Sequence, residues 1–370
     1  MKVKYINPGR EYLLHQDEIS STIHRVMLDG SFILREDVEK FEFNVAARLG
    51  VKHVIGLNSG TDALFYSLAA LGLKSQDEVI TVAHTFVATI ASIVHVGATP
   101  VLVDIANNFN IDPYKIEEKI TEKTKALLPV HMNGRACDMD TIERLSAKYG
   151  LMIIEDAAQA FGAKFKGRSV GTFGEVGCFS AHPMKVLGGP GDGGYVVTNS
   201  RTVDQRLRLL RNHGQRTKTD ITSYGFSSRL DNLHAAILNV KLKYVDKTIR
   251  RRRSIALSYH QGLQRLPIKL PAPPSDGDYF DVYNSYVIRV QASARDSLAE
   301  FLARQGIEVF SHMAIPLFKN ENLKLDGAGL ETNEKLANEI ISLPVYPELT
   351  DGEVEYVIIS LKKFFNTEAH

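Results

Sequence analysis

A lysine beside a glycine-rich loop is the side chain of this sequence best suited to covalent chemistry. Lys185 ends the run Ser180-Ala-His-Pro-Met-Lys and precedes the glycine-rich segment 188–194. Residues 176–181 have the composition of a buried strand, so Lys185 is expected near the carboxyl edge of a sheet, where α/β folds bind ligands. A partly neutral lysine can form a Schiff base with an aldehyde cofactor. The alternative is a surface lysine, which is the commoner case for an isolated lysine.

Three side chains at the ends of other expected strands could hold the ring of such a cofactor. Asp156 ends the run 151–156, and its carboxylate could keep a pyridinium nitrogen protonated, which makes the ring an electron sink. Gln159 could reach a ring hydroxyl, and His84, after the run 78–82, could stack on the ring. The alternatives are a helix N-cap for Asp156 and a buried, satisfied histidine for His84.

A phosphate site is expected where the strand predicted at 53–57 leads into a helix. Gly60 and Thr61 lie at the expected start of a helix over 61–71, where free amides and the helix dipole attract an anion. Ser180 could add its hydroxyl to the same phosphate. Simple helix capping by Ser59 or Thr61 is the alternative.

The glycine-rich segment also suggests a nicotinamide cofactor, but its context disagrees. Gly189, Gly191 and Gly194 satisfy the letter pattern of a dinucleotide fingerprint. A true fingerprint follows a strand and opens a helix, whereas this one enters a strand expected at 195–199. A tight or mobile turn is the simpler interpretation, because glycine permits it.

The composition of the 370 residues excludes several classes. Hydrophobic residues make up 44% and charged residues 24%, which argues against disordered, fibrous and membrane proteins. The formal net charge is +1, so neither nucleic acid nor a membrane is an expected partner. Cys137 and Cys178 are too few for a disulfide framework or a structural zinc site, and no metal is expected. They fit a reducing cytosol, and residues 1–19 lack the apolar core of a secretory signal, so a cytoplasmic location is expected.

Short β-branched runs alternate with amphipathic stretches, which predicts an α/β fold with a large, mostly parallel sheet covered by helices. Seven strands are expected, at 53–57, 78–82, 100–105, 125–130, 151–156, 176–181 and 195–199. Helices are expected at 61–71, 85–95, 113–120 and 139–148. The side chains named above lie where several of these strands end.

The pattern changes after about residue 200. We expect a helix at 204–211 and a long one at 230–264, whose basic run Arg250–Arg253 indicates a solvated face rather than a nucleic-acid patch. A proline-rich break at 266–278 predicts a large domain over 1–265 and a small α+β domain over 266–370. The small domain is expected to contain a strand at 283–290, a helix at 293–306 capped by Ser293, and a strand at 307–312.

Together these motifs resemble the DegT/DnrJ/EryC/StrS family of pyridoxal-phosphate-dependent nucleotide-sugar aminotransferases. The resemblance is carried by Ser59-Gly60-Thr61, His84-Thr85-Phe86, Glu155-Asp156-Ala157-Ala158-Gln159, Ser180 with Pro183-Met184-Lys185, and Gly191-Asp192-Gly193-Gly194. It extends to 131–140, 208–214 and 229–238, and so covers nearly the whole chain. It implies the fold-type I aminotransferase fold and a homodimer with active sites at the subunit interface. It also implies transfer of an amino group from glutamate to a nucleotide-linked keto-sugar, at C3 or C4.

Position by position, the resemblance implies roles that agree with the chemistry above. Lys185 would form the Schiff base with pyridoxal 5'-phosphate and then move protons, while Asp156, Gln159 and His84 would hold the ring nitrogen, the ring hydroxyl and the ring face. Gly60, Thr61 and Ser180 would bind the phosphate. Residues 306–316 resemble the family's substrate-side stretch, which makes His312 a candidate contact for sugar or donor. Arg229 could bind an anionic ligand group. The alternatives are a surface histidine and an ion pair at a helix start.

Three departures from the family pattern accompany the resemblance. Ser227 stands where many members have an asparagine that reaches the neighbouring subunit's phosphate, Asn133-Gly134-Arg135 stands for Tyr-Gly-Gln, and Val186 stands for asparagine. Lys185 separates the sequence from a deoxygenating subgroup that has histidine there. Two other classes stay open: a non-catalytic cofactor-binding or regulatory protein on the same fold, and a nicotinamide oxidoreductase.

Overall fold

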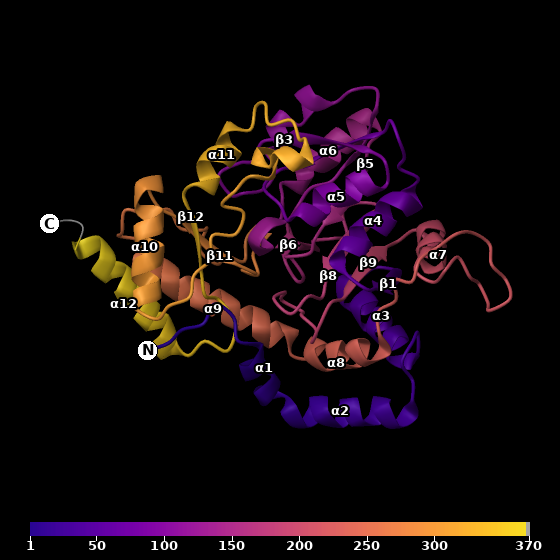
Figure 1. The fold of residues 1–370 in the computed structure, drawn as a ribbon, viewed down its shortest axis with the longest axis horizontal. Coiled ribbons are helices and arrows are strands. Elements are labelled where there is room, and N and C mark those ends of the chain that lie inside the picture. The colour runs from indigo at the N-terminus through magenta and orange to yellow at the C-terminus, as the bar shows by residue number, and fades with distance from the viewer. Residues whose placement is uncertain (368–370) are drawn as a thin grey trace.

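The structure is a computed structural model and describes residues 1–367. Its core is one seven-stranded sheet (Figure 1). Its strands are, in spatial order, β1 (His53–Leu57), β9 (Gly194–Thr198), β8 (Val176–Ser180), β5 (Met152–Asp156), β4 (Thr124–Leu127), β2 (Glu78–Val82) and β3 (Thr99–Val103). The strands from β8 to β3 are parallel, and β9 runs antiparallel to both of its neighbours. The α/β fold with a large, mostly parallel sheet is therefore confirmed.

Three helices between the strands cover the sheet, α4 (Gly60–Leu71), α5 (Val87–His95) and α6 (Met139–Tyr149), together with α7 (Arg201–Leu210), which follows β9. The start of α4 is fixed by Ser59, whose Oγ accepts from the Asp62 amide at 3.0 Å. Its end is fixed by Gly72, which adopts a φ of +85° that other residues avoid. The helix expected at 113–120 is wrong, because two 3₁₀ turns, Pro113–Lys115 and Glu117–Lys119, occupy this segment.

Three N-terminal helices that the sequence analysis did not anticipate precede the sheet: α1 (Pro8–Leu14), α2 (Gln16–Asp29) and α3 (Glu36–Leu49). Helix α3 packs against β1 through Val38, Phe41 and Val45, which are completely buried. Their spacing of three and four residues is that of one apolar helix face. This face was the signal in the sequence that could have revealed α3.

The expected helix at 230–264 is two helices, α8 (Asn232–Leu242) and α9 (Val245–Leu263), which meet at a break before Tyr244. Figure 1 shows α9 running from α8 toward α10 and α12. The interpretation of Arg250–Arg253 as a solvated face is wrong for Arg252, which is 6% exposed. Its Nη1 donates to the carbonyls of Tyr283 at 3.1 Å and of Val345 at 3.4 Å, so the guanidinium satisfies carbonyl groups in the protein interior.

A second apolar core joins the end of α9 to the C-terminal elements. These are β11 (Tyr286–Arg289), α10 (Ala292–Arg304), β12 (Ile340–Leu343) and α12 (Asp351–Thr367), whereas β10 (Tyr279–Phe280) and α11 (Glu331–Ala337) pack against the first core. Strand β10 joins a small sheet with β6 (Lys164–Phe165) and β7 (Arg168–Ser169). Because α9 contributes to both cores, it connects them. The division between 265 and 266 stays a prediction.

Two expectations for the C-terminal part are wrong. The strand expected at 307–312 makes only single bridges, from Ile307 to Val3 and from Phe310 to Ser342, because β12 is the partner of β11. The helix α10 begins at Ala292 after Gln291, so Ser293 is not its cap. None of the helices within residues 1–367 is both long and apolar enough to cross a membrane.

Asp104, directly after β3, ties the start of α11 to the large sheet. Its buried carboxylate accepts from the Thr332 amide at 3.0 Å, the Asn333 amide at 2.9 Å and Lys115 Nζ at 3.0 Å. Burial acts to raise the pKa of Asp104, but these donors outweigh it and leave the pKa below its usual value. The carboxylate is therefore a fixed anchor for a segment far along the chain.

We expect Asp104→Ala to lower the free energy of unfolding at neutral pH by about 3 kcal/mol, because it leaves the two amides at the start of α11 and the partly exposed Lys115 without their acceptor. Since the folded pKa is depressed, this stabilisation is present above the unfolded pKa and is lost as the pH falls through the folded value. Denaturant unfolding measures both effects. The exposed Asp326→Ala is the control, and equal losses in the two variants would contradict the anchor.

Candidate active site

A cavity of about 310 Å³ opens where β1, β2, β5 and β8 end. Eight of the nine residues singled out from the sequence line it: Gly60, Thr61, His84, Asp156, Gln159, Ser180, Lys185 and His312. The ninth, Arg229, does not line it, and its Nη1 donates to Asn212 Oδ1 at 3.3 Å. Side chains from four strand ends thus meet at one place, as the carboxyl edge of a parallel sheet requires.

Lys185 lies in the turn after β8, half-buried in the cavity wall. Its amide donates to the His182 carbonyl at 2.9 Å, which closes the turn and aims the side chain. Burial lowers the pKa of Lys185, and the Asp156 carboxylate acts in the opposite direction. A larger fraction of this amine is therefore neutral than of an exposed lysine, which is what a nucleophilic lysine needs.

Asp156, the last residue of β5, is 5% exposed. Its Oδ1 accepts from the Ala158 amide at 3.1 Å and its Oδ2 from Thr89 Oγ1 at 2.8 Å. Burial raises the pKa of Asp156, and the hydrogen bond from Thr89 is the largest opposing effect. The helix-cap alternative is wrong, because turns rather than a helix follow Asp156.

The turn between β1 and α4 presents backbone amides to the cavity. Because Ser59 caps α4 through the Asp62 amide, the amides of Gly60 and Thr61 lie in the first helical turn, ahead of the helical hydrogen-bond ladder. Gly60 has no room for a side chain, since a Cβ there would lie 2.8 Å from Ser180 Cβ. Capping and anion binding are thus compatible, with Ser180 beside the free amides.

Gln159 is oriented by the loop that departs from the family pattern. Its Oε1 accepts from the Asn133 amide at 2.9 Å, which leaves the side-chain NH2 as the group able to donate into the cavity. Asn133 itself adopts a φ of +59°, in the left-handed region that asparagine tolerates better than most residues other than glycine. The sequence offered no signal for this contact.

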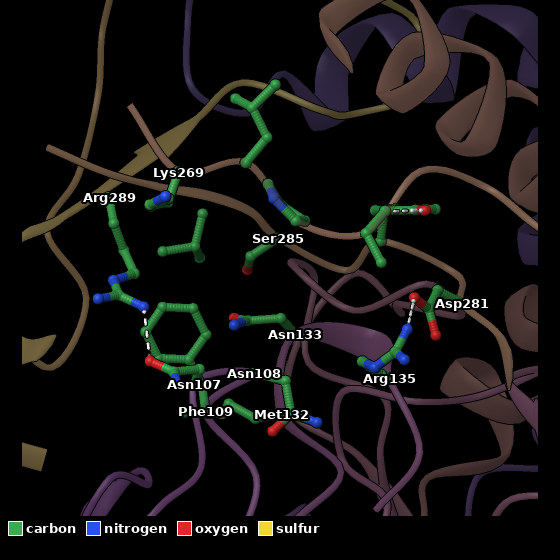
Figure 2. Close-up of a pocket in the computed structure, with 15 residues that line it drawn as sticks. Asn107, Asn108, Phe109, Met132, Asn133, Arg135, Lys269, Asp281, Ser285 and Arg289 are labelled. Carbon is green, nitrogen blue, oxygen red and sulfur yellow. Dashed lines mark hydrogen bonds and ion pairs between the residues drawn. The ribbon is translucent and has the colours of Figure 1, made fainter. Parts of the chain in front are cut away.

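A larger cavity of about 460 Å³ lies next to the first and shares Met132, Asn133, Ser285 and Val287 with it. Figure 2 shows Arg289 beside Asn107 on one side of it and Arg135 beside Asp281 on the other, with Asn133 and Ser285 between them. Arg135 forms an ion pair with Asp281 at 2.5 Å, and Arg289 pairs with Glu339 at 2.9 Å. Asn133 therefore stands in the wall between two cavities.

His84 is buried, at 3% exposed, and stacks on Phe109 with ring centroids 5.2 Å apart. Burial lowers its pKa to about 4, so the ring is neutral at physiological pH. Its Nδ1 is buried without a hydrogen-bond partner in residues 1–367, so the alternative of a satisfied core histidine is wrong. The exposed His312 stacks on Phe310 at 5.5 Å and lies at the cavity rim.

We expect His84→Phe to remove an acid-dependent loss of stability from the cofactor-free protein. Between pH 6.5 and about 4, His84 is protonated in the unfolded chain but neutral in the folded protein, so the free energy of unfolding falls with decreasing pH. The fall is up to about 3 kcal/mol for this residue. Urea unfolding across this pH range measures it, and an identical slope in both proteins would refute the assignment.

The comparisons with known proteins decide the family. The model of the DegT/DnrJ/EryC1/StrS aminotransferase family matches residues 14–362. The chain belongs to this family. It is 40% identical to dTDP-3-amino-3,6-dideoxy-alpha-D-galactopyranose transaminase of Aneurinibacillus thermoaerophilus, over 95% of this chain and 96% of that one. It is 39% identical to a protein of Geobacillus stearothermophilus named pleiotropic regulatory protein, over 99% of both chains.

Solved structures of the DegT/DnrJ/EryC1/StrS family agree with this fold. DesV of S. venezuelae, solved in complex with a ketimine intermediate, superposes with a TM-score of 0.94 at 36% identity and 98% coverage of both chains. NtdA of Bacillus subtilis, solved with bound cofactor PMP, superposes with a TM-score of 0.89 at 30% identity, over 99% of this chain and 85% of that one. The protein is an aminotransferase and its cofactor is pyridoxal 5'-phosphate, which overturns the nicotinamide and non-catalytic alternatives.

Proposed function

We propose that the protein moves an amino group from glutamate to a nucleotide-linked keto-sugar, at C3 or C4. Three of its relatives are named as transaminases of dTDP- or UDP-linked sugars. The observation that carries the proposal is the meeting of Lys185, with its lowered pKa, and the buried carboxylate of Asp156 in one cavity. An amine and an acid so arranged suit reversible amino transfer.

The residues of the cavity fit pyridoxal phosphate. The unpartnered Nδ1 of buried His84, the space closed to a side chain at Gly60 and the free amides of Gly60 and Thr61 match a flat ring bearing a phosphate. When bound, the cofactor supplies a carbonyl that takes up the amino group and a ring that stores an electron pair. Asp156 would hold a proton on the ring nitrogen, Gln159 would donate to the ring hydroxyl and Ser180 to the phosphate.

Lys185 would act twice. Its Nζ would bind the cofactor covalently in the resting enzyme and, once the donor amine takes its place, would take the proton from the donor's α-carbon. The lowered pKa of Lys185 supports both roles, because each needs a neutral amine. The same amine would return a proton when the keto-sugar is the acceptor.

We further propose that two copies of the chain form a homodimer with the cavity at their boundary, and that it works in the cytoplasm. Phe86, which lines the cavity, is 65% exposed, and Tyr224, which does not line it, is fully exposed in the segment before Arg229. Large aromatic side chains left in water favour a covering partner. Light scattering after size exclusion would measure a dimer, and a stable monomer that transfers amines would refute this part.

Stopped reactions test the chemistry. Wild-type protein reconstituted with pyridoxal phosphate and given glutamate alone is expected to release one 2-oxoglutarate per site and convert the cofactor to its amine form. Borohydride before glutamate should fix the cofactor to Lys185, as peptide mass spectrometry would show. Nucleotide-linked 3-keto and 4-keto sugars then compete as acceptors, with the product position read by NMR. Absence of 2-oxoglutarate with glutamate, beside a positive result with another amino acid, would refute the donor assignment.

A further inference from the structure

A line of buried hydroxyl groups in the cavity wall ends on the Asp156 carboxylate. Thr85 Oγ1 lies 2.6 Å from Thr89 Oγ1, and Thr89 Oγ1 lies 2.8 Å from Asp156 Oδ2. Thr85 is 2% exposed and Thr89 is completely buried. Thr89 lies in the first turn of α5, and Thr85 just precedes that helix. All of the polar atoms in this line are shielded from bulk water.

The direction of the hydrogen bonds follows from counting protons. Thr89 has one hydroxyl hydrogen, and the carboxylate, which can only accept, takes it. Thr89 must then accept from Thr85, whose own hydrogen points along the line. Each donor polarises the next in such a chain, so the bond that reaches Asp156 is stronger than an isolated one.

Other groups around Asp156 do not replace this donor. Ala158 donates its amide to Oδ1, and the charged groups that act on the carboxylate are Lys185 and His131. His131, on the other side, accepts from the Cys137 amide at Nδ1 and therefore turns a protonated Nε2 to Glu155 at 3.0 Å. Glu155 is further satisfied by the amides of residues 171, 173 and 174. Thr89 is thus the side-chain donor to Asp156 Oδ2.

We propose that Thr89, supported by Thr85, is a positioning residue that keeps Asp156 ionised and aimed at the cofactor's ring nitrogen. This rests on the proposed role of Asp156. The geometry supplies the reason: a carboxylate buried this deeply must accept hydrogen bonds to remain charged, and only the charged form can hold a proton on the ring. Burial raises the pKa of Asp156 and the Thr89 hydroxyl opposes that rise.

Thr89→Val tests the proposal, because valine has nearly the same shape and lacks the donor. Hydrogen bonds to charged groups are strong enough that we expect kcat to fall about tenfold to a hundredfold, with a smaller change in KM. The acid limb of kcat is expected to move up by about one pH unit, since the carboxyl ionises later. Thr89→Ser retains the hydroxyl and should restore both values to near those of wild type.

Thr85→Val tests whether Thr85 acts on Asp156 through Thr89. If Thr85 acts through Thr89, its substitution shifts the acid limb in the same direction by less, and adds nothing in the Thr89→Val background. An acid limb of Thr89→Val that coincides with wild type, whatever its melting temperature, would overturn the proposal. So would a Thr89→Ser protein as impaired as Thr89→Val.

Cofactor affinity distinguishes this inference from the proposed function. Titration of the cofactor-free proteins with pyridoxal phosphate needs neither glutamate nor a sugar, and Thr89→Val is expected to weaken Kd at least about tenfold. Weakened binding in a protein that does not use glutamate would leave the inference standing and refute the donor. Unchanged binding in an enzyme that transfers amines from glutamate would refute the inference alone.

Discussion

Lys185→Ala is expected to lose amino transfer by at least about 10³-fold while keeping its fold, because the substitution removes the proton-transfer group from the cavity. Lys185→Arg should be equally inactive, since guanidinium keeps the charge but does not deprotonate in proteins. Single-turnover release of 2-oxoglutarate from glutamate measures the loss. An added small primary amine should restore part of the activity of the alanine variant and none of the arginine variant.

The exposed surface lysine Lys125 provides a matched control for this experiment, and Lys125→Ala should transfer amines at the wild-type rate. Circular dichroism and urea unfolding check that the Lys185 variants are folded. A Lys185→Ala protein that retains more than about a tenth of the wild-type rate would refute the role of this lysine in proton transfer. A fully active Lys185→Arg protein would show that charge, rather than a neutral amine, is what the site needs.

Gly194→Ala is expected to disrupt the phosphate turn and the sheet together. A Cβ at this position would lie 2.2 Å from the Ser59 carbonyl oxygen and 2.6 Å from the Gly60 nitrogen. Because both are backbone atoms, either β9 or the turn must move, and overpacking of this kind costs about 3 kcal/mol. We therefore expect a loss of that size in the free energy of unfolding and at least about tenfold weaker binding of pyridoxal phosphate.

Gly189→Ala is the control in the same loop, because a Cβ there would lie 3.4 Å from its nearest neighbour, the Ala181 carbonyl oxygen. Its stability and cofactor affinity should be close to those of wild type. Urea unfolding and cofactor titration give both quantities for each variant. Equal behaviour of the two alanine variants would show that the close approach at Gly194 does not support the phosphate turn.

The sheet and most of the candidate site could be predicted because their signals are local. Asp156 and Ser180 are each the last residue of an apolar strand, and Gly60 opens a helix, so a parallel sheet brings them to one edge. Thr89 was missed because it lies in helix α5 and its partner Asp156 ends β5, far along the chain. Its signal was a threonine four residues after Thr85 in an otherwise apolar stretch.

Other features depend on packing that no short window of sequence contains. No glycine or proline marks the break before Tyr244, so the apolar pattern predicted one continuous helix across it. The segment 307–312 has the alternation of a strand, but β12 takes the place beside β11. Arg252 stands beside three other arginines in the sequence, which favoured a solvated side chain. The fold shows that it donates to three backbone carbonyls instead, those of Tyr283, Asn284 and Val345.

The place of β9 in the sheet has a consequence for biosynthesis. β1 lies at the edge of the sheet and its sole neighbour there is β9, the last of the seven strands to leave the ribosome. Until β9 is synthesised, the turn at Gly60 therefore lacks the strand that packs against it, and β1 stays an unpaired, apolar segment of the nascent chain. Contacts this distant in sequence make folding slow. Chains halted before residue 194 should accordingly bind chaperones rather than cofactor.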